Sequence, residues 1–183
     1  MIRIISGTYK GRMINIPSSK LTRPTMDKVR QAIFSIIKKY INEDAIFLDL
    51  FAGSGAMGIE AISRGVKKTY FNEKDPSAFK VIKENLKSLD VDPCLYELCL
   101  KDYRLFLKKY KDVKFDVVFL DPPYRFKVNQ DVIKKMKEDD MLSSSAIIIS
   151  EQDEKNKEVE GFFMKEYKYS EKYVAIYSLE EFL

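Results

Sequence analysis

The chain contains no histidine in its 183 residues. Histidine is the commonest general base in enzymes and the usual partner of a catalytic serine or cysteine, so Ser-His and Cys-His arrangements are excluded. A zinc site of the usual Cys/His kind is not expected either, because Cys94 and Cys99 are the only cysteines. We expect both to be core or strand residues. Any chemistry must therefore use carboxylates, backbone groups and the positioning of reactants.

Long apolar runs are also missing from the chain. No run approaches the roughly 20 apolar residues that cross a bilayer, and the first residues, 1–5, lack the layout of a signal peptide. A hydrophobic content of 45% suits a globular domain of ordinary size. We therefore expect a cytoplasmic protein with no membrane partner.

Acidic residues are scarce at the start of the chain. Residues 1–40 hold nine Lys or Arg and one Asp, a balance of +8, whereas the whole chain carries +4. This asymmetry predicts an amino-terminal part that faces a polyanion. A solvated basic face without a ligand would have the same composition.

The amino-terminal part reads as a hairpin followed by a helix. Short β-rich runs at 3–6 and 12–16 flank a glycine-containing loop, and the apolar residues after Thr25 fall at helical spacing to about Tyr40. Thr25 is a candidate helix cap. We expect a basic extension over residues 1–42 and a main domain over residues 43–183.

The main domain alternates strands and helices, the pattern of a mostly parallel sheet covered on both faces. The last two strands form an antiparallel hairpin. The expected strands are 45–50, 68–72, 93–98, 115–120, 146–150, 162–169 and 172–178; the expected helices begin near 57, 76, 103 and 128. The sequence thus predicts an α/β, Rossmann-like fold with a seven-stranded sheet.

The first of these strands leads into a glycine turn. Gly53, Gly55 and Gly58 spell G-x-G-x-x-G, and Glu73 follows about 20 residues on. Asp49 ends the strand where a carboxylate would repel a pyrophosphate. S-adenosylmethionine is cationic and has no phosphate, so Asp49 can hold its amino-acid end while Glu73 accepts hydrogen bonds from its ribose. An ordinary tight turn between strand and helix is the alternative.

Asp102 follows the third strand of the main domain, at the edge where such folds bind ligands. There it could accept a hydrogen bond from the adenine amino group of a cofactor. A residue that only caps the helix starting at Tyr103 would look the same in the sequence. Both interpretations remain open at this point.

Asp121, Pro122, Pro123 and Tyr124 directly follow an apolar strand and form the most specific motif of the chain. The exocyclic amine of a nucleobase is a poor nucleophile, because its lone pair is delocalised into the ring. Acceptors on the amine hydrogens localise that pair, and the Asp121 carboxylate and the Pro122 carbonyl can provide them. The Tyr124 ring can stack on the base. The alternative is a rigid loop whose tyrosine only packs.

Together these motifs resemble the RsmD-type bacterial 16S rRNA guanine-N2 methyltransferases, over nearly the whole chain. The glycine turn and Asp-Pro-Pro-Tyr occur in many amino-methyltransferases, whereas the opening hairpin and the following basic motif narrow the match to this family. The matching stretches are Arg23-Pro24-Thr25 with Asp27 and Arg30, Asp49 to Gly55, Glu73-Lys74-Asp75, and Asp121 to Tyr124.

The resemblance implies a class I methyltransferase fold, S-adenosylmethionine as methyl donor without a metal, and a guanine of 16S rRNA in an assembling small ribosomal subunit as substrate. A monomer is expected. By the same match the cofactor residues would be Asp49, Phe51, Ala52, Gly53, Ser54, Gly55, Glu73 and Asp102. Tyr103 departs from the family, which more often has a small residue there.

The basic residues Lys10, Arg12, Arg23 and Arg30 are predicted to contact RNA phosphates, from charge and position only. Two other functions fit parts of the pattern. A DNA adenine-N6 methyltransferase would also use Asp-Pro-Pro-Tyr, although 183 residues leave little room for a target-recognition domain. A non-catalytic RNA-binding factor of ribosome assembly would keep the fold without turnover.

Overall fold

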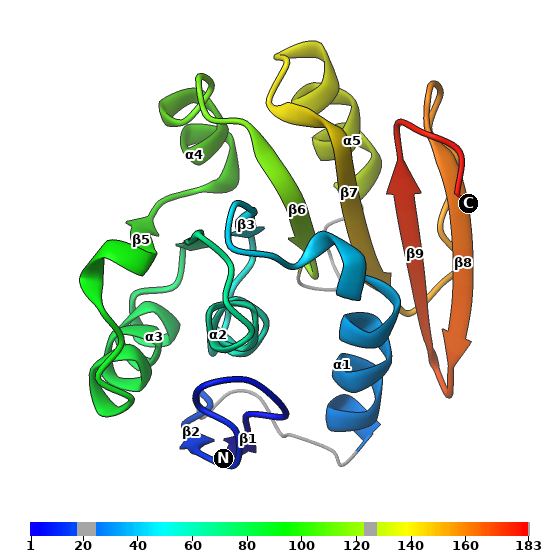
Figure 1. Cartoon of the computed structure of the whole chain (residues 1–183). Helices are drawn as coiled ribbons and strands as arrows, with labels where there is room; N and C mark the ends of the chain where they lie inside the picture. The colour runs from blue at the N-terminus through cyan, green and yellow to red at the C-terminus, as the bar shows by residue number, and fades with distance from the viewer. Residues whose placement is uncertain (18–24, 123–127, 183) are drawn as a thin grey trace.

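A computed structural model describes residues 1–17, 25–122 and 128–182. Its main sheet has seven strands in the order β5-β4-β3-β6-β7-β9-β8 (Figure 1). The strands are β3 (Ile46–Asp49), β4 (Lys68–Glu73), β5 (Tyr96–Leu100), β6 (Phe115–Leu120), β7 (Leu142–Gln152), β8 (Phe163–Tyr169) and β9 (Lys172–Ser178). The structure confirms the predicted mostly parallel sheet with a terminal antiparallel hairpin.

Five α-helices and two short 3₁₀ helices connect the strands within the described ranges. The helices are α1 (Thr25–Ile36), α2 (Ala56–Ser63), α3 (Pro76–Ser88), α4 (Tyr103–Lys109) and α5 (Asn129–Glu138), with 3₁₀ turns at Lys38–Tyr40 and Pro93–Leu95. None of the helices in these ranges has the length and apolar character needed to cross a bilayer.

The register of the strands brings their carboxyl ends to one edge of the sheet. β3 lies between β4 and β6 and is parallel to both, and β7 is parallel to β6. The chain runs outward from β3 to β5 and then returns to β6, so the strand order reverses beside β3. In open α/β sheets, ligands bind outside the carboxyl ends of the strands at such a reversal.

The core forms on both faces of the sheet, because alternate residues of the central strands point in opposite directions. On one face, Phe47 of β3 packs with α1 and α2, whereas on the other Leu48 packs with α4 and α5. Every strand from β3 to β7 is thus covered on at least one side, and β3, β6 and β7 on both. This double coverage explains why these strands read as nearly continuous apolar runs.

The predicted amino-terminal hairpin is present, with shorter strands than expected. β1 (Ile2–Arg3) pairs with β2 (Met13–Ile14). The hairpin packs against α2 and α3, where the Ile5 and Ser6 N–H groups donate to the Glu60 carboxylate at 2.8 and 3.0 Å. Its apolar residues share one core cluster with α2 and α3. The boundary between 1–42 and 43–183 stays a prediction.

Three local predictions need correction. Pro93–Leu95 is a 3₁₀ turn capped by Asp92, so the expected strand from residue 93 begins at Tyr96, and Cys94 is exposed rather than in a strand or the core. Cys99 is buried in β5, as expected. The helix expected to reach about Tyr40 ends at Ile36 and is followed by the 3₁₀ turn at Lys38–Tyr40. Thr25, the candidate cap, is the first residue of α1, and the position before it lies outside the described residues.

Gly7 sits where the hairpin touches the end of α2, and it has φ +82°. A Cβ atom at Gly7 would lie 1.6 Å from the Ser63 carbonyl oxygen, whereas Gly11, with φ +84°, has open space. We predict that Gly11→Ala costs about 1–2 kcal/mol from backbone strain and that Gly7→Ala costs at least about 2 kcal/mol more. Urea unfolding measures both, and equal costs would contradict this packing.

Candidate functional site

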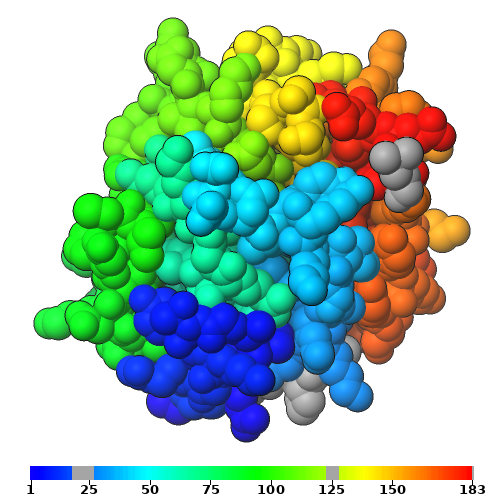
Figure 2. All heavy atoms as spheres, viewed as in Figure 1, coloured from blue at the N-terminus to red at the C-terminus, as the bar shows by residue number. Residues whose placement is uncertain are grey.

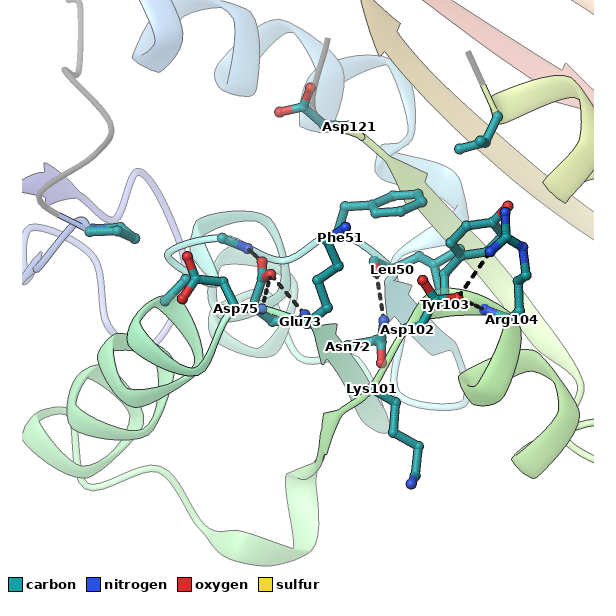
Figure 3. Close-up of a pocket in the computed structure, with 15 residues that line it drawn as sticks. Leu50, Phe51, Asn72, Glu73, Asp75, Lys101, Asp102, Tyr103, Arg104 and Asp121 are labelled. Atoms are coloured by element: carbon teal, nitrogen blue, oxygen red, sulfur yellow. Dashed lines mark hydrogen bonds and ion pairs between the residues drawn. The ribbon is translucent and has the colours of Figure 1, made fainter. Parts of the chain in front are cut away.

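A cavity of about 280 Å³ opens at the carboxyl edge of the sheet, at the reversal of strand order (Figure 3). Its walls come from the segments that follow β3, β4, β5 and β6. Pro17, Asp121 and Val128 also line it, and Pro17 and Val128 each adjoin in sequence a part of the chain outside the described residues. Of the predicted cofactor residues, Phe51, Gly53, Glu73 and Asp102 line the cavity, whereas Asp49, Ala52, Ser54 and Gly55 do not.

The glycine turn is held by the carboxylate that ends β3. Asp49 is only 1% exposed, and its Oδ2 accepts a hydrogen bond of 3.0 Å from the Gly58 N–H in α2. The positive end of the α2 dipole favours a carboxylate at this place. Gly58 must stay small, because a Cβ atom there would lie 2.2 Å from the Phe71 ring. A role for Asp49 at the amino-acid end of a cofactor stays a prediction.

Glu73 clamps the glycine turn to the end of β4. Its Oε2 accepts a hydrogen bond of 2.8 Å from the Gly53 N–H, and its Oε1 accepts from the N–H groups of Lys74 and Asp75 at 2.8 and 2.9 Å. A carboxylate offers about four acceptor positions. With three of them used by the backbone, one remains for a ligand hydroxyl in the cavity.

Asp102 is confirmed as a helix cap, whereas its hydrogen bond to an adenine amino group stays a prediction. It caps α4 by accepting a hydrogen bond of 3.0 Å from the Arg104 N–H, and it also lines the cavity. Beside it, the Phe51 and Tyr103 rings lie 5.6 Å apart between centroids, tilted by 54°. The Arg104 guanidinium lies over the Tyr103 ring at 5.0 Å. This aromatic pair offers flat apolar surface for a planar ring.

Asp121 directly follows β6 and lines the cavity across from Asp102 (Figure 3). Pro122 is buried. Pro123 and Tyr124, the other two residues of the predicted catalytic motif, lie outside the described residues. The structure therefore brings the first residue of the motif to the same cavity as Glu73 and Asp102, which are distant in the sequence.

Sequence reasoning missed several cavity residues: Asn72, Lys74, Asp75, Lys101, Tyr103 and Arg104. Each stands at the end of a strand or in the first residues beyond it, so position relative to the strand ends could have identified them. Lys101 points away from the cavity (Figure 3).

A buried acid near Asp121 was also missed. Glu151 lies near the end of β7, and burial, followed by the negative charge of Asp121, raises its pKa to about 7. Lys172 of β9 opposes this shift, with its Nζ 3.7 Å from Glu151 Oε1 and 2.8 Å from Asp153 Oδ1. No motif marked Glu151, because its proximity to Asp121 depends on the pairing of β6 with β7.

The predicted RNA contacts divide into three groups. Lys10 and Arg12 are exposed on the hairpin, which forms the dark blue surface beside α1 in Figure 2. Arg23 lies outside the described residues. Arg30 does not fit a phosphate contact, because its side chain is 6% exposed and bonds the Arg3 carbonyl and, at 3.1 Å, Asp27. Arg30 instead ties α1 to the hairpin.

Comparisons with known proteins agree with this architecture. A family model described as conserved hypothetical protein 95 matches residues 2–178. The ribosomal RNA small subunit methyltransferase D of Haemophilus influenzae is 38% identical over 151 residues, 82% of this chain and 78% of that protein. The putative rRNA methyltransferase YlbH of Bacillus subtilis is 37% identical over 83% of each chain.

The solved structure of the putative methyltransferase yhhF from Escherichia coli superposes with a TM-score of 0.85, at 29% identity over 97% of each chain. The putative methylase HI0767 from Haemophilus influenzae gives a TM-score of 0.82 at 31% identity, over 98% of this chain and 99% of that one. These likenesses confirm the predicted class I methyltransferase fold. With matches of this extent, the chain belongs to the RsmD family, described as conserved hypothetical protein 95.

Proposed function

We propose that this protein transfers a methyl group from S-adenosylmethionine to the exocyclic N2 amine of a guanine in 16S rRNA. Methylation of rRNA is supported by relatives named ribosomal RNA small subunit methyltransferase D. The observation that carries the proposal is the position of Asp121, which starts the Asp-Pro-Pro-Tyr motif beside the cavity at the strand reversal. We further propose that the substrate is an assembling small subunit and that the enzyme acts as a monomer.

The cavity residues fit S-adenosylmethionine better than a nucleotide with phosphates. Glu73 keeps an acceptor position, Asp102 lines the wall, and the Phe51 and Tyr103 rings can contact adenine. Carboxylates at these places would repel a pyrophosphate. When bound, S-adenosylmethionine supplies an electrophilic methyl group. A cavity of about 280 Å³ is near the lower bound of small-molecule sites.

The chain itself must make the amine nucleophilic and position it. The Asp121 carboxylate and the Pro122 carbonyl accept hydrogen bonds from the amine hydrogens, which localises the nitrogen lone pair. Pro122 has no N–H that could donate a hydrogen bond to the nitrogen lone pair, and its fixed φ keeps the backbone rigid. After transfer the amine nitrogen carries a positive charge, and its extra proton leaves to Asp121 or to water. No strong base is needed, which suits a chain without histidine.

Transfer of labelled methyl groups followed by nucleoside identification tests the proposal. The substrates are unmodified small-subunit particles, naked 16S rRNA and duplex DNA. We expect N2-methylguanosine in 16S rRNA, with particles as the better substrate. N6-methyladenine in DNA would instead establish a DNA methyltransferase. Intact cofactor binding without any transfer would establish a non-catalytic assembly factor.

Lys10 and Arg12 are expected to contact RNA phosphates. Such contacts release cations that are condensed on the RNA, so the affinity for RNA should fall as the salt concentration rises. Each phosphate contact contributes about one unit to the slope of log K against log salt. We predict that Lys10→Gln and Arg12→Gln each lower this slope by about one unit, as measured by RNA binding over a salt series. The matched control is Lys111→Gln, an exposed lysine after α4. Equal slopes for all variants would exclude the hairpin as an RNA contact.

A further inference from the structure

The carboxyl ends of β6 and β7 place two acidic residues side by side. Leu120 of β6 pairs with Ser150 of β7 in parallel register, and Asp121 and Glu151 directly follow these residues. Neighbouring strands lie about 4.8 Å apart. Glu151 is therefore the acidic residue of β7 that lies closest in register to Asp121, the proposed catalytic residue. The two carboxylates interact electrostatically.

The Glu151 carboxyl group differs from the other acids of this edge in what it bonds. Asp49, Glu73 and Asp102 each accept hydrogen bonds from backbone N–H groups. Glu151 is 14% exposed, and its partner is the Lys172 ammonium, 3.7 Å away. Among the described residues no backbone N–H bonds this carboxyl group. A carboxylate offers about four acceptor positions, and the Lys172 contact uses only part of them.

The charges around Glu151 make its own charge variable near neutral pH. Asp121 and Asp153 act on it with like charge and raise its pKa, whereas Lys172 lowers it. Together with burial, which contributes most, these groups give a pKa of about 7. The carboxyl group therefore passes from proton donor to pure acceptor within the physiological range.

The edges of guanine and adenine differ at the atom next to the amine. In guanine the carbon that carries the amine also bonds N1–H, a donor, whereas in adenine the neighbouring N1 is an acceptor. An ionised carboxylate beside Asp121 can accept a hydrogen bond from guanine N1–H but repels the lone pair of adenine N1. When a wrong ligand would leave a buried polar group of the pocket without a hydrogen-bond partner, the pocket rejects that ligand strongly.

We propose that Glu151 is a specificity-determining residue, which in its ionised form accepts a hydrogen bond from the ring N1–H of the target guanine while Asp121 holds the exocyclic amine. This inference rests on the proposed function. Lys172 and Asp153 are positioning residues, because they act on the base only through Glu151.

The first test is the pH profile of kcat/KM for transfer to small-subunit particles. The wild type should lose activity below an apparent pKa near 7. Glu151→Gln should flatten the profile between pH 6 and 8 and lower kcat/KM at pH 8 by about 10- to 100-fold. Its affinity for S-adenosylmethionine, measured by calorimetry, should not change. An acid limb that persists in Glu151→Gln would overturn the proposal.

Two neighbouring variants keep Glu151 and shift its pKa in opposite directions. Asp153→Asn removes a like charge, so the acid limb should move to lower pH. Lys172→Met removes an opposite charge, so the limb should move to higher pH. Asp153 is half exposed, so Asp153→Asn is expected to fold normally. A merely structural role for Glu151 would leave the limb in place, and that result would contradict the proposal.

A base analogue separates this proposal from the proposed function. 2-Aminopurine carries the same amine as guanine but no N1–H. In particles with 2-aminopurine at the modified position, the wild type should prefer guanine by about 100-fold at pH 8, and Glu151→Gln should reduce this preference at least about tenfold. An unchanged preference, with N2-methylguanosine as the wild-type product, would overturn the role of Glu151 alone. A different methylated product would overturn the proposed function.

Discussion

Replacing Asp121 with alanine is expected to lower kcat for methyl transfer by about 1,000-fold. The variant loses the carboxylate that accepts from the amine hydrogens, so the nitrogen lone pair stays delocalised into the base. Asp121 directly follows β6 and lies beyond the residues that pair β6 with β3, so we expect this pairing to persist in the variant. Single-turnover transfer from labelled S-adenosylmethionine measures the loss.

The controls for Asp121 separate chemistry from binding. Asp121→Asn keeps one acceptor oxygen and adds an NH₂ donor, so its rate should fall between those of the wild type and the alanine variant. Asp112→Ala removes an exposed carboxylate before β6 and should leave the rate unchanged. Affinity for S-adenosylmethionine should stay within about twofold in all three. An Asp121→Ala enzyme with full activity would refute the proposed mechanism.

Replacing Glu73 with glutamine is expected to weaken the binding of S-adenosylmethionine by about 10- to 100-fold. Three backbone N–H groups donate to this carboxylate, and a glutamine NH₂ would face at least one of them. Loss of one hydrogen bond to a charged group costs about 1.5–3 kcal/mol. Two changes should weaken cofactor binding: the glycine turn is displaced, and the cofactor loses a carboxylate acceptor.

Isothermal calorimetry measures the affinity of Glu73→Gln, and thermal unfolding measures its stability. Glu84→Gln is the matched control, because Glu84 is 52% exposed on α3 and, within the described part of the chain, its ion pair is with Lys80 at 3.9 Å. A surface pair of this kind contributes about 0–1 kcal/mol. If Glu73→Gln bound S-adenosylmethionine as tightly as the control, the cavity beside β4 would not be the cofactor site.

Several features were predictable from the sequence because they depend on neighbouring residues. Strand-length apolar runs alternate with segments whose apolar residues recur at helical spacing, and this alternation predicted the parallel sheet. The G-x-G-x-x-G turn and the Asp-Pro-Pro-Tyr motif each occupy one short stretch after a strand. The error at Pro93 arose within one stretch as well. There Asp92 accepts from the Cys94 N–H at 2.8 Å, and this capped turn competes with the strand.

The amino-acid sequence by itself determined the fold class, the strand ends that form the site and the family. Only the tertiary structure decided which charged side chains are buried in structural contacts and which lie beside the proposed catalytic residue. Arg30 looked like a phosphate ligand until the packing of α1 on the hairpin buried it. Glu151 lies beside Asp121 through the parallel register of β6 and β7. Burial and long-range register set the environment of a charge, and neither is encoded by the residues next to it.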